Sequence, residues 1–179
     1  MNRFRNQLAA FVLLLCTSAA FAQNDIIYLH NGQTVEGKVF KISESTVTFA
    51  YANEDAEQTL GKYAVEKVVY GKSGRSQNIT DKIIVNSSED WKNVIIIENT
   101  DEIAGLKRVG EVKGKTAFIN YRTGEGSDRK ALEKLKKDAA AMHCQFIFIT
   151  TDKDIDRKSD DGGSFGQLQS IKKGIAYSY

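Results

Sequence analysis

The chain has few cysteines and histidines, no proline and no long hydrophobic run. Its 179 residues include two cysteines and two histidines. The apolar stretch at residues 8–16 covers nine residues, whereas a helix needs about 20 apolar residues to cross a bilayer. We therefore expect no membrane span in the mature protein, and few side chains are available for a soft-metal site or a nucleophile–base pair.

The first 22 residues have the organisation of a secretory signal peptide. Arg3 and Arg5 precede the apolar stretch, and residues 20–22 read Ala-Phe-Ala. Small residues at the first and third positions before the cut are those that signal peptidase accepts, so we expect cleavage before Gln23. The segment predicts an exported protein.

Lipidation of Cys16 is the alternative to simple cleavage. Lipoprotein processing requires a small residue immediately before the modified cysteine, and Leu15 stands at that position. Either route places the protein in the periplasm or at the cell surface of a bacterium, which argues against ATP-driven or nucleic-acid chemistry. After removal of the leader, Cys144 is the only cysteine, so no intrachain disulfide can form and an apolar core must stabilise the fold.

Neither sign of charge dominates the mature chain. The full chain has 25 Lys and Arg and 23 Asp and Glu. The leader contains two basic residues and no acidic one, which leaves 23 of each sign. A general polyanion binder would carry a basic excess, so we expect no nucleic-acid partner. The remaining 157 residues are enough for one ordinary domain or two small ones.

Short strands are predicted throughout residues 25–72. Apolar and polar residues alternate, or apolar residues cluster, at residues 25–30, 34–42, 46–51, 59–60 and 65–70. Asn31-Gly32 lies between the first two segments and is a strong hairpin signal, because both residues tolerate positive φ. Gly37 indicates a bulge or bend. Five short strands with a bend predict a small SH3-like or Sm-like β-barrel.

Residues 73–90 are polar and rich in turn-forming residues, which predicts a linker with or without one bridging strand. Residues 91–179 then form a second predicted unit. Apolar runs predict strands at 94–97, 146–149 and 175–179, and Lys113-Gly114-Lys115 predicts a turn between two further strands. A charged loop is expected over residues 152–163.

One amphipathic helix is predicted between these strands. Leu132, Leu135, Ala139 and Met142 recur at steps of three and four, which places them on one face. A helix of this length can cross a small sheet. We therefore expect an α+β unit in which an antiparallel or mixed sheet is covered by one helix.

Two parts of the sequence resemble known families. Residues 25–32, 35–39 and 65–71 resemble the small SH3-like modules of secreted Bacteroidetes proteins. Residues 103–112, 131–140 and 146–149 resemble the YbjQ-type family and the core of the Rcs envelope-stress sensor lipoproteins. In those families the same order of strand, helix and strand forms a small α+β layer.

The second resemblance implies assembly at the envelope, because YbjQ-type relatives tend to form rings. The resemblance therefore allows homo-oligomerisation of this chain without requiring it. The metal-binding label of that family is not supported by any cluster of cysteine and histidine here. The disulfide-linked signalling of the stress sensors needs cysteine pairs, and Cys144 is alone. No cofactor is implied.

His143-Cys144 is the only adjacent pair of soft metal ligands, and His30 is the only other histidine. Two adjacent residues cannot complete a four-ligand zinc site. We expect His143 to end the helix near its negative dipole end, and Cys144 to pack at the start of a buried strand.

Five aspartates lie in the predicted charged loop: Asp152, Asp154, Asp156, Asp160 and Asp161. Their spacing imitates an EF-hand loop, but Arg157 stands where the turn requires glycine, and Gly163 stands where a bidentate glutamate is required. We expect a solvated loop with no calcium binding tighter than about millimolar, a weak calcium site being the alternative.

Six aromatic residues of the first unit could line a peptide-binding groove or form its core: Tyr28, Phe40, Phe49, Tyr51, Tyr63 and Tyr70. No catalytic, cofactor-binding or metal-binding residue is predicted, and we expect no enzyme. The sequence favours an exported, non-enzymatic cell-envelope protein that binds a protein or peptide partner in interaction or assembly. The alternative is a small-ligand or metal-ion binding protein of the envelope.

Overall fold

The computed structural model describes residues 24–116, 124–157 and 167–179. The predicted signal peptide, with Cys16, lies outside these residues, as do Asp160, Asp161 and Gly163. The described chain is mainly β, with two sheets and one long helix, α2 (Gly124–Ala141). This composition fits an α+β class loosely.

Six antiparallel strands form the first sheet, in the order β4-β3-β2-β1-β5-β6. The strands are β1 (Asp25–Leu29), β2 (Thr34–Ile42), β3 (Thr46–Tyr51), β4 (Glu57–Gly61), β5 (Val65–Val69) and β6 (Ser76–Asn78). Their alternation buries one apolar set, which includes Ile27, Val47 and Phe49. The Asn31-Gly32 turn joins β1 to β2, and Gly32 has the positive φ of 87° that such a turn requires.

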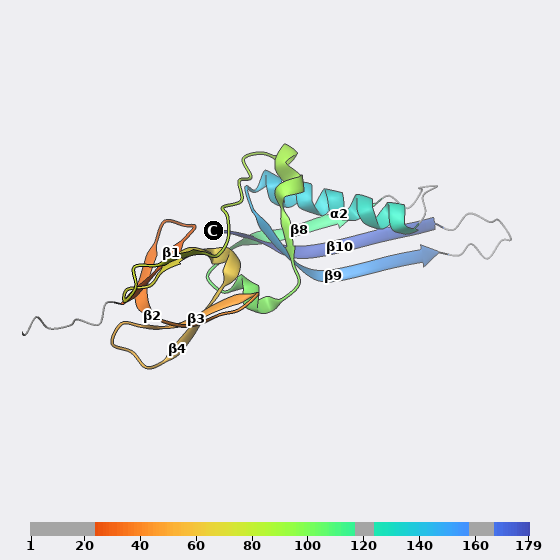
Figure 1. Cartoon of the computed structure of the whole chain (residues 1–179). Helices are drawn as coiled ribbons and strands as arrows, with labels where there is room; N and C mark the ends of the chain where they lie inside the picture. Colours follow the sequence, from red (N-terminus) through yellow and green to blue (C-terminus); the bar gives the residue numbers. More distant parts are fainter. Residues whose placement is uncertain (1–23, 117–123, 158–166) are drawn as a thin grey trace, which may run out of the picture.

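The first sheet is curved (Figure 1) but is not a closed barrel, which corrects the predicted SH3-like β-barrel. A barrel closes only when its two edge strands pair, and β4 and β6 are separate edges here. β6 has only three residues. The end of β4 is covered instead by a distant segment, because the backbone N–H of Gly61 donates to the carbonyl of Ala104 at 2.7 Å.

The second sheet has the order β7-β9-β10-β8. Its strands are β7 (Ile95–Ile97), β8 (Lys107–Lys115), β9 (Phe146–Arg157) and β10 (Gln167–Ser178). β7 and β9 are parallel and the other pairs are antiparallel. Helix α2 covers one face of this sheet (Figure 1). Of the two predicted forms, an antiparallel or a mixed sheet covered by one helix, the structure has the mixed one.

The predictions of a turn at residues 113–115 and of a loop beginning at residue 152 are wrong, because both segments belong to long strands. β8 continues through Lys113-Gly114-Lys115, where a turn was expected. At Gly114 the helix comes so close that a Cβ would overlap the carbonyl oxygen of Ala131. The residues expected to begin the charged loop, up to Arg157, belong to β9 and pair with β10.

The core between α2 and the sheet contains the residues that the helical periodicity identified. Leu135 and Ala139 are fully buried there, together with Val112 of β8 and Ile147 of β9. The helix ends as predicted: His143 adopts a φ of 56°, and the N–H of the next residue donates back to the carbonyl of Ala139 at 3.0 Å.

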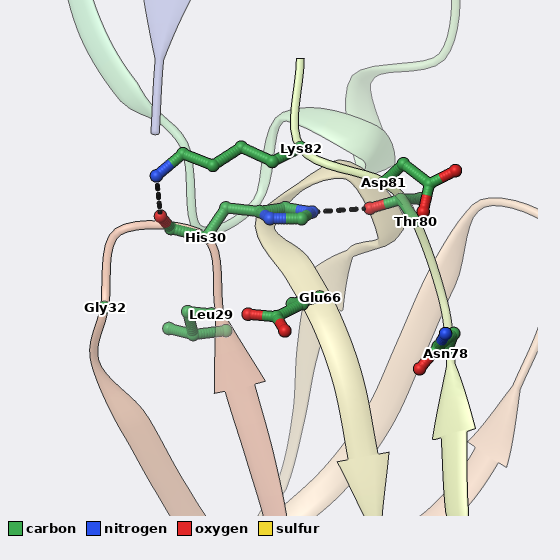
Figure 2. A pocket seen from close by; sticks show the side chains of 8 residues that line it. All are labelled: Leu29, His30, Gly32, Glu66, Asn78, Thr80, Asp81 and Lys82. Carbon is green, nitrogen blue, oxygen red and sulfur yellow. Dashed lines mark hydrogen bonds between the residues drawn. The ribbon is translucent and has the colours of Figure 1, made fainter. Parts of the chain in front are cut away.

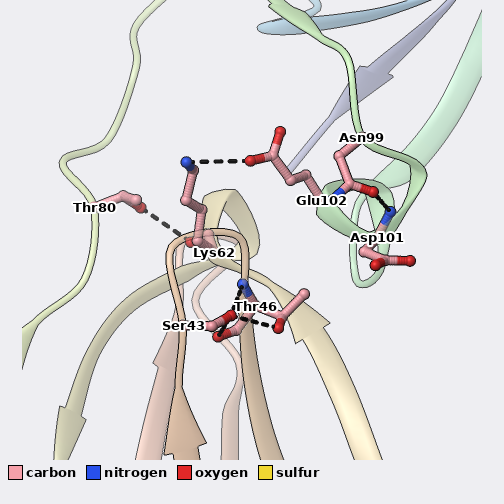
Figure 3. A network of polar contacts seen from close by, with 7 residues as sticks. All are labelled: Ser43, Thr46, Lys62, Thr80, Asn99, Asp101 and Glu102. Atoms are coloured by element: carbon pink, nitrogen blue, oxygen red, sulfur yellow. Dashed lines mark hydrogen bonds and ion pairs between the residues drawn. The ribbon is translucent and has the colours of Figure 1, made fainter.

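The two sheets share a third apolar cluster at their junction. Phe146 of β9 lies at its centre with 0% exposure, and its ring contacts Tyr63 at 5.0 Å and Tyr179 at 5.3 Å between ring centroids. An ion pair of 3.1 Å between Lys62 and Glu102 lies beside this cluster (Figure 3). Apolar and polar contacts therefore both join the two sheets.

Residues 73–90, predicted as a linker, include strand β6 and the first residues of the 3-10 helix η2 (Ser88–Asn93). Val85 is buried in the core below α2. The backbone N–H of Ile83 donates to the hydroxyl of Tyr179 at 2.9 Å, near the C-terminus. This segment thus packs on the second sheet, and the division into two domains stays a prediction.

Candidate binding site

A polar pocket of about 440 Å³ lies at the end of β1 (Figure 2). The C-terminal Tyr179 packs against its His30. We call this site the His30 pocket. Its lining residues come from the β1–β2 hairpin, from β5, from β6 and from the segment after β6: Leu29, His30, Gly32, Glu66, Asn78, Thr80, Asp81 and Lys82. Its size is in the range of ordinary ligand pockets.

His30 is held in one orientation by hydrogen bonding. Its exposure is only 4%, and its Nε2 lies 2.9 Å from the Thr80 hydroxyl. That hydroxyl has a single hydrogen and lies 2.8 Å from the carbonyl of Val65, which can only accept. Thr80 therefore donates to Val65, and His30 Nε2 carries the proton that is donated to Thr80.

Lys82 and Tyr179 complete the frame around this histidine. The ammonium of Lys82 donates to the backbone carbonyl of His30 at 3.0 Å (Figure 2). The Tyr179 ring packs against the imidazole with 4.8 Å between centroids. Burial raises the pKa of the Tyr179 hydroxyl, although the hydroxyl accepts a hydrogen bond from the backbone N–H of Ile83.

The pocket also contains two carboxylates that take no part in the hydrogen bonds that hold His30. Asp81 forms no hydrogen bond or ion pair with another residue in the part of the chain that the structure describes. Among the described residues, the side chain of Glu66 has only an exposed ion pair of 3.4 Å with its neighbour Lys67. Together with the ammonium of Lys82, they give the pocket two acidic groups and one basic group. The pocket is thus net negative.

The pKa of His30 lies below its ordinary value of 6.5. Burial is the largest cause, and the nearby ammonium of Lys82 acts in the same direction. The carboxylates of Glu66 and Asp81 oppose the shift but do not reverse it. The imidazole is therefore neutral near pH 7.

This shift predicts a loss of stability in mild acid. The unfolded chain binds a proton at His30 more readily than the folded chain, so stability falls as the pH drops from about 6.5 toward the folded pKa. Denaturant melts of the wild type and His30→Gln across this range should show that the substitution removes this dependence. His143→Gln is the matched control, because that imidazole is exposed. Equal pH dependence in the wild type and in His30→Gln would contradict the prediction.

The His143-Cys144 pair does not form a site. Cys144 is fully buried in the core below α2, where its thiol donates to the carbonyl of Met142 at 3.5 Å. Burial raises the pKa of this thiol. The predicted structural roles of both residues are confirmed, since His143 ends the helix and Cys144 packs in the core.

The acidic segment has a structural contact that the sequence did not indicate. Asp152 and Asp128 of α2 each lie 2.6 Å from the ammonium of Lys172, which is only 4% exposed. Burial acts to lower the pKa of Lys172, but its hydrogen bonds to the two carboxylates outweigh burial and raise it. Asp154 accepts a hydrogen bond of 2.6 Å from Ser170. Asp152 and Asp154 are thus two positions apart on β9, and both contact side chains of β10.

The six aromatic residues do not line a single groove. Phe49 is in the core of the first sheet and Tyr63 packs at the junction between the sheets. Phe40 and Tyr51 are exposed by 45% and 43%. Tyr28 and Tyr70 are half-buried beneath basic side chains. The aromatic side chains are therefore divided between core and surface.

Within the described ranges, no three or more His, Cys, Asp and Glu side chains are grouped so that they could hold a metal ion. The described helices include none with the length and apolar character that a membrane crossing needs. The metal-ion alternative stays an untested hypothesis.

No protein-family model, curated protein or solved structure matches this chain. The resemblances to SH3-like modules and to the YbjQ-type family therefore stay predictions.

Proposed function

We propose that this chain is an exported, non-enzymatic protein of the bacterial cell envelope that binds a protein or peptide partner at the His30 pocket. The observation that carries the proposal is the pair of exposed carboxylates, Glu66 and Asp81, in a concave site where neither takes part in the hydrogen bonds that hold His30. They favour a basic side chain of the partner, because complementary charges give specificity and fast association.

Binding fits the remaining groups of the pocket better than catalysis does. The proton on Nε2 of His30 is donated to Thr80, and the ammonium of Lys82 donates to a backbone carbonyl. These groups support the shape of the pocket. The carboxylates have lone pairs and could act as bases, but we assign them to charge pairing and hydrogen-bond acceptance with a basic group of the partner.

One of the predicted resemblances agrees with this function. The YbjQ-type resemblance implies assembly at the envelope, where a protein partner would be met. The apolar cluster around Phe146 joins the two sheets and so gives the pocket a rigid border, which lowers the entropic cost of binding.

The partner proposal is tested by affinity capture from envelope extract. Wild-type protein should retain a partner that Glu66→Gln/Asp81→Asn loses, because the double variant removes both carboxylates without changing side-chain size. Glu54→Gln/Glu57→Gln is the matched control, since it removes two exposed carboxylates outside the pocket, one in the β3–β4 connection and one at the start of β4. Equal capture by the pocket variant and the wild type would contradict the proposal.

Export is tested by intact-mass analysis of the protein recovered from the envelope. We expect a mass that begins at Gln23, because residues 20–22 fit the cleavage site of a signal peptide. A new N-terminus at Cys16 carrying a diacylglyceryl group would show that the protein is a lipoprotein instead. Retention of the uncleaved leader in the cytoplasm would contradict export.

A further inference from the structure

A second pocket, of about 530 Å³, lies at the opposite end of β1 from the His30 pocket. We call it the basic pocket. Residues from the start of β1, from β2 and from the β5–β6 hairpin line it, and four of them are charged: Asp25, Lys38, Lys72 and Arg75. Three cations thus face a single carboxylate.

That carboxylate is fully engaged by the backbone. Asp25 Oδ2 accepts from the N–H of Val39 at 2.9 Å, and Asp25 Oδ1 accepts from the N–H of Gly71 at 3.0 Å. The two bonds fasten β2 and the β5–β6 hairpin to the first residue of β1. Asp25 therefore builds the floor of the basic pocket and offsets one of its three cations, which leaves a net positive charge.

Arg75 is pre-organised above this floor. Its guanidinium stacks on the ring of Tyr70 at 4.5 Å from the centroid, and one of its N–H groups donates to Gln77 Oε1 at 3.3 Å. The hydroxyl of Tyr70 donates to the same oxygen at 3.0 Å. A guanidinium fixed in this way loses little conformational entropy when it binds an oxyanion with its remaining donors.

Neither lysine is neutralised by a carboxylate. Lys38 and Lys72 are exposed and form no ion pair with another described residue, and the same holds for Arg75. The ammonium of Lys38 lies 5.2 Å from the centroid of the Phe40 ring. Ser73 adds a hydroxyl to the lining. Arginine, lysine and hydroxyl groups are those that proteins use to bind phosphate.

We infer that the basic pocket binds a phosphate group, with Arg75 as the directional ligand and Lys38 and Lys72 as charge partners. This site is separate from the His30 pocket and does not depend on the function proposed there. The phosphate can come from a free phosphate compound or from a lipid headgroup, and the chemistry of recognition is the same for both.

Two arms of one experiment separate these sources. In the first, inorganic phosphate is titrated into the mature protein while the backbone amide signals of Lys72, Ser73 and Gly74 are followed by NMR. In the second, flotation measures binding to phosphatidylcholine vesicles with and without phosphatidic acid. Arg75→Gln should weaken binding by about tenfold to a hundredfold in any arm that shows it, because a charge-assisted hydrogen bond is lost. Lys41→Gln removes one charge from β2 outside the pocket and is the matched control.

Each outcome decides the inference. Saturable phosphate binding that Arg75→Gln weakens and Lys41→Gln preserves supports a site for free phosphate. Binding only to vesicles with phosphatidic acid, with the same dependence on Arg75, supports a headgroup site. No binding in either arm, or equal weakening by the two substitutions, overturns the inference, because diffuse surface charge would explain the latter.

Discussion

Replacing Leu135 with alanine is expected to lower the free energy of unfolding by about 2–5 kcal/mol. Leu135 lies at the middle of α2 with 0% exposure, in the core that α2 forms with the second sheet. The loss combines the transfer energy of the deleted atoms with the cavity that they leave. Urea denaturation followed by circular dichroism measures it directly.

A surface substitution on the same helix provides the control. Arg129 is exposed, so Arg129→Ala should change the free energy of unfolding by no more than about 0.5 kcal/mol. Lys134 is also exposed but is a less clean control, because its ammonium donates to the carbonyl of Lys115 at 2.9 Å. Equal losses for Leu135→Ala and Arg129→Ala would show that α2 is not packed on the sheet as described.

Phe146→Ala is expected to cost about 3–5 kcal/mol, since a fully buried aromatic ring is removed. Its effect should reach both sheets, because the ring contacts Tyr63 near the first sheet and Tyr179 at the end of the second. Denaturant melts followed by near-ultraviolet dichroism and by amide NMR signals of both sheets test this expectation.

In the wild type we expect the two sheets to unfold at the same denaturant concentration. In Phe146→Ala we expect both midpoints to move to lower concentration. Phe40→Ala is the control, because that ring is 45% exposed and lies outside the junction. If the first sheet kept its midpoint while the second sheet lost stability, the shared cluster would not couple them.

The sequence predicts those elements whose pattern is local. β2 and β3 were predicted at their observed bounds, because alternation of apolar residues reports directly on a half-buried strand. The helix followed from the spacing of Leu132 and Leu135, and the β1–β2 turn from Asn31-Gly32. In each case the neighbouring residues alone determine the conformation.

Predictions failed where a tertiary contact overrides the local signal. The sequence predicts a turn at Gly114, but glycine is required there because α2 approaches β8 too closely for a side chain. Asp152 was placed in a solvated loop because it is charged, yet Lys172 and the pairing with β10 keep it in a strand. Closure of the first sheet also depends on long-range pairing, which a strand pattern does not specify.

The His30 pocket was not predicted because its residues are distant in the sequence. His30 and Thr80 are fifty positions apart, and Glu66 reaches the site through the pairing of β5 with β1. No spacing rule connects these residues. The only local signal was the polar pair Asp81-Lys82 in the predicted linker, where a charged turn was an equally good interpretation.

Site-specific photo-crosslinking tests the central claim most directly. A photoreactive amino acid at Asn78, which is exposed and lines the His30 pocket, should yield a discrete adduct with one envelope protein in living cells. The adduct should disappear in the Glu66→Gln/Asp81→Asn background, and the same probe at Thr59, exposed on β4, should not form it. Absence of an adduct from Asn78, or an adduct unaffected by loss of the two carboxylates, would contradict a partner-binding role for this pocket.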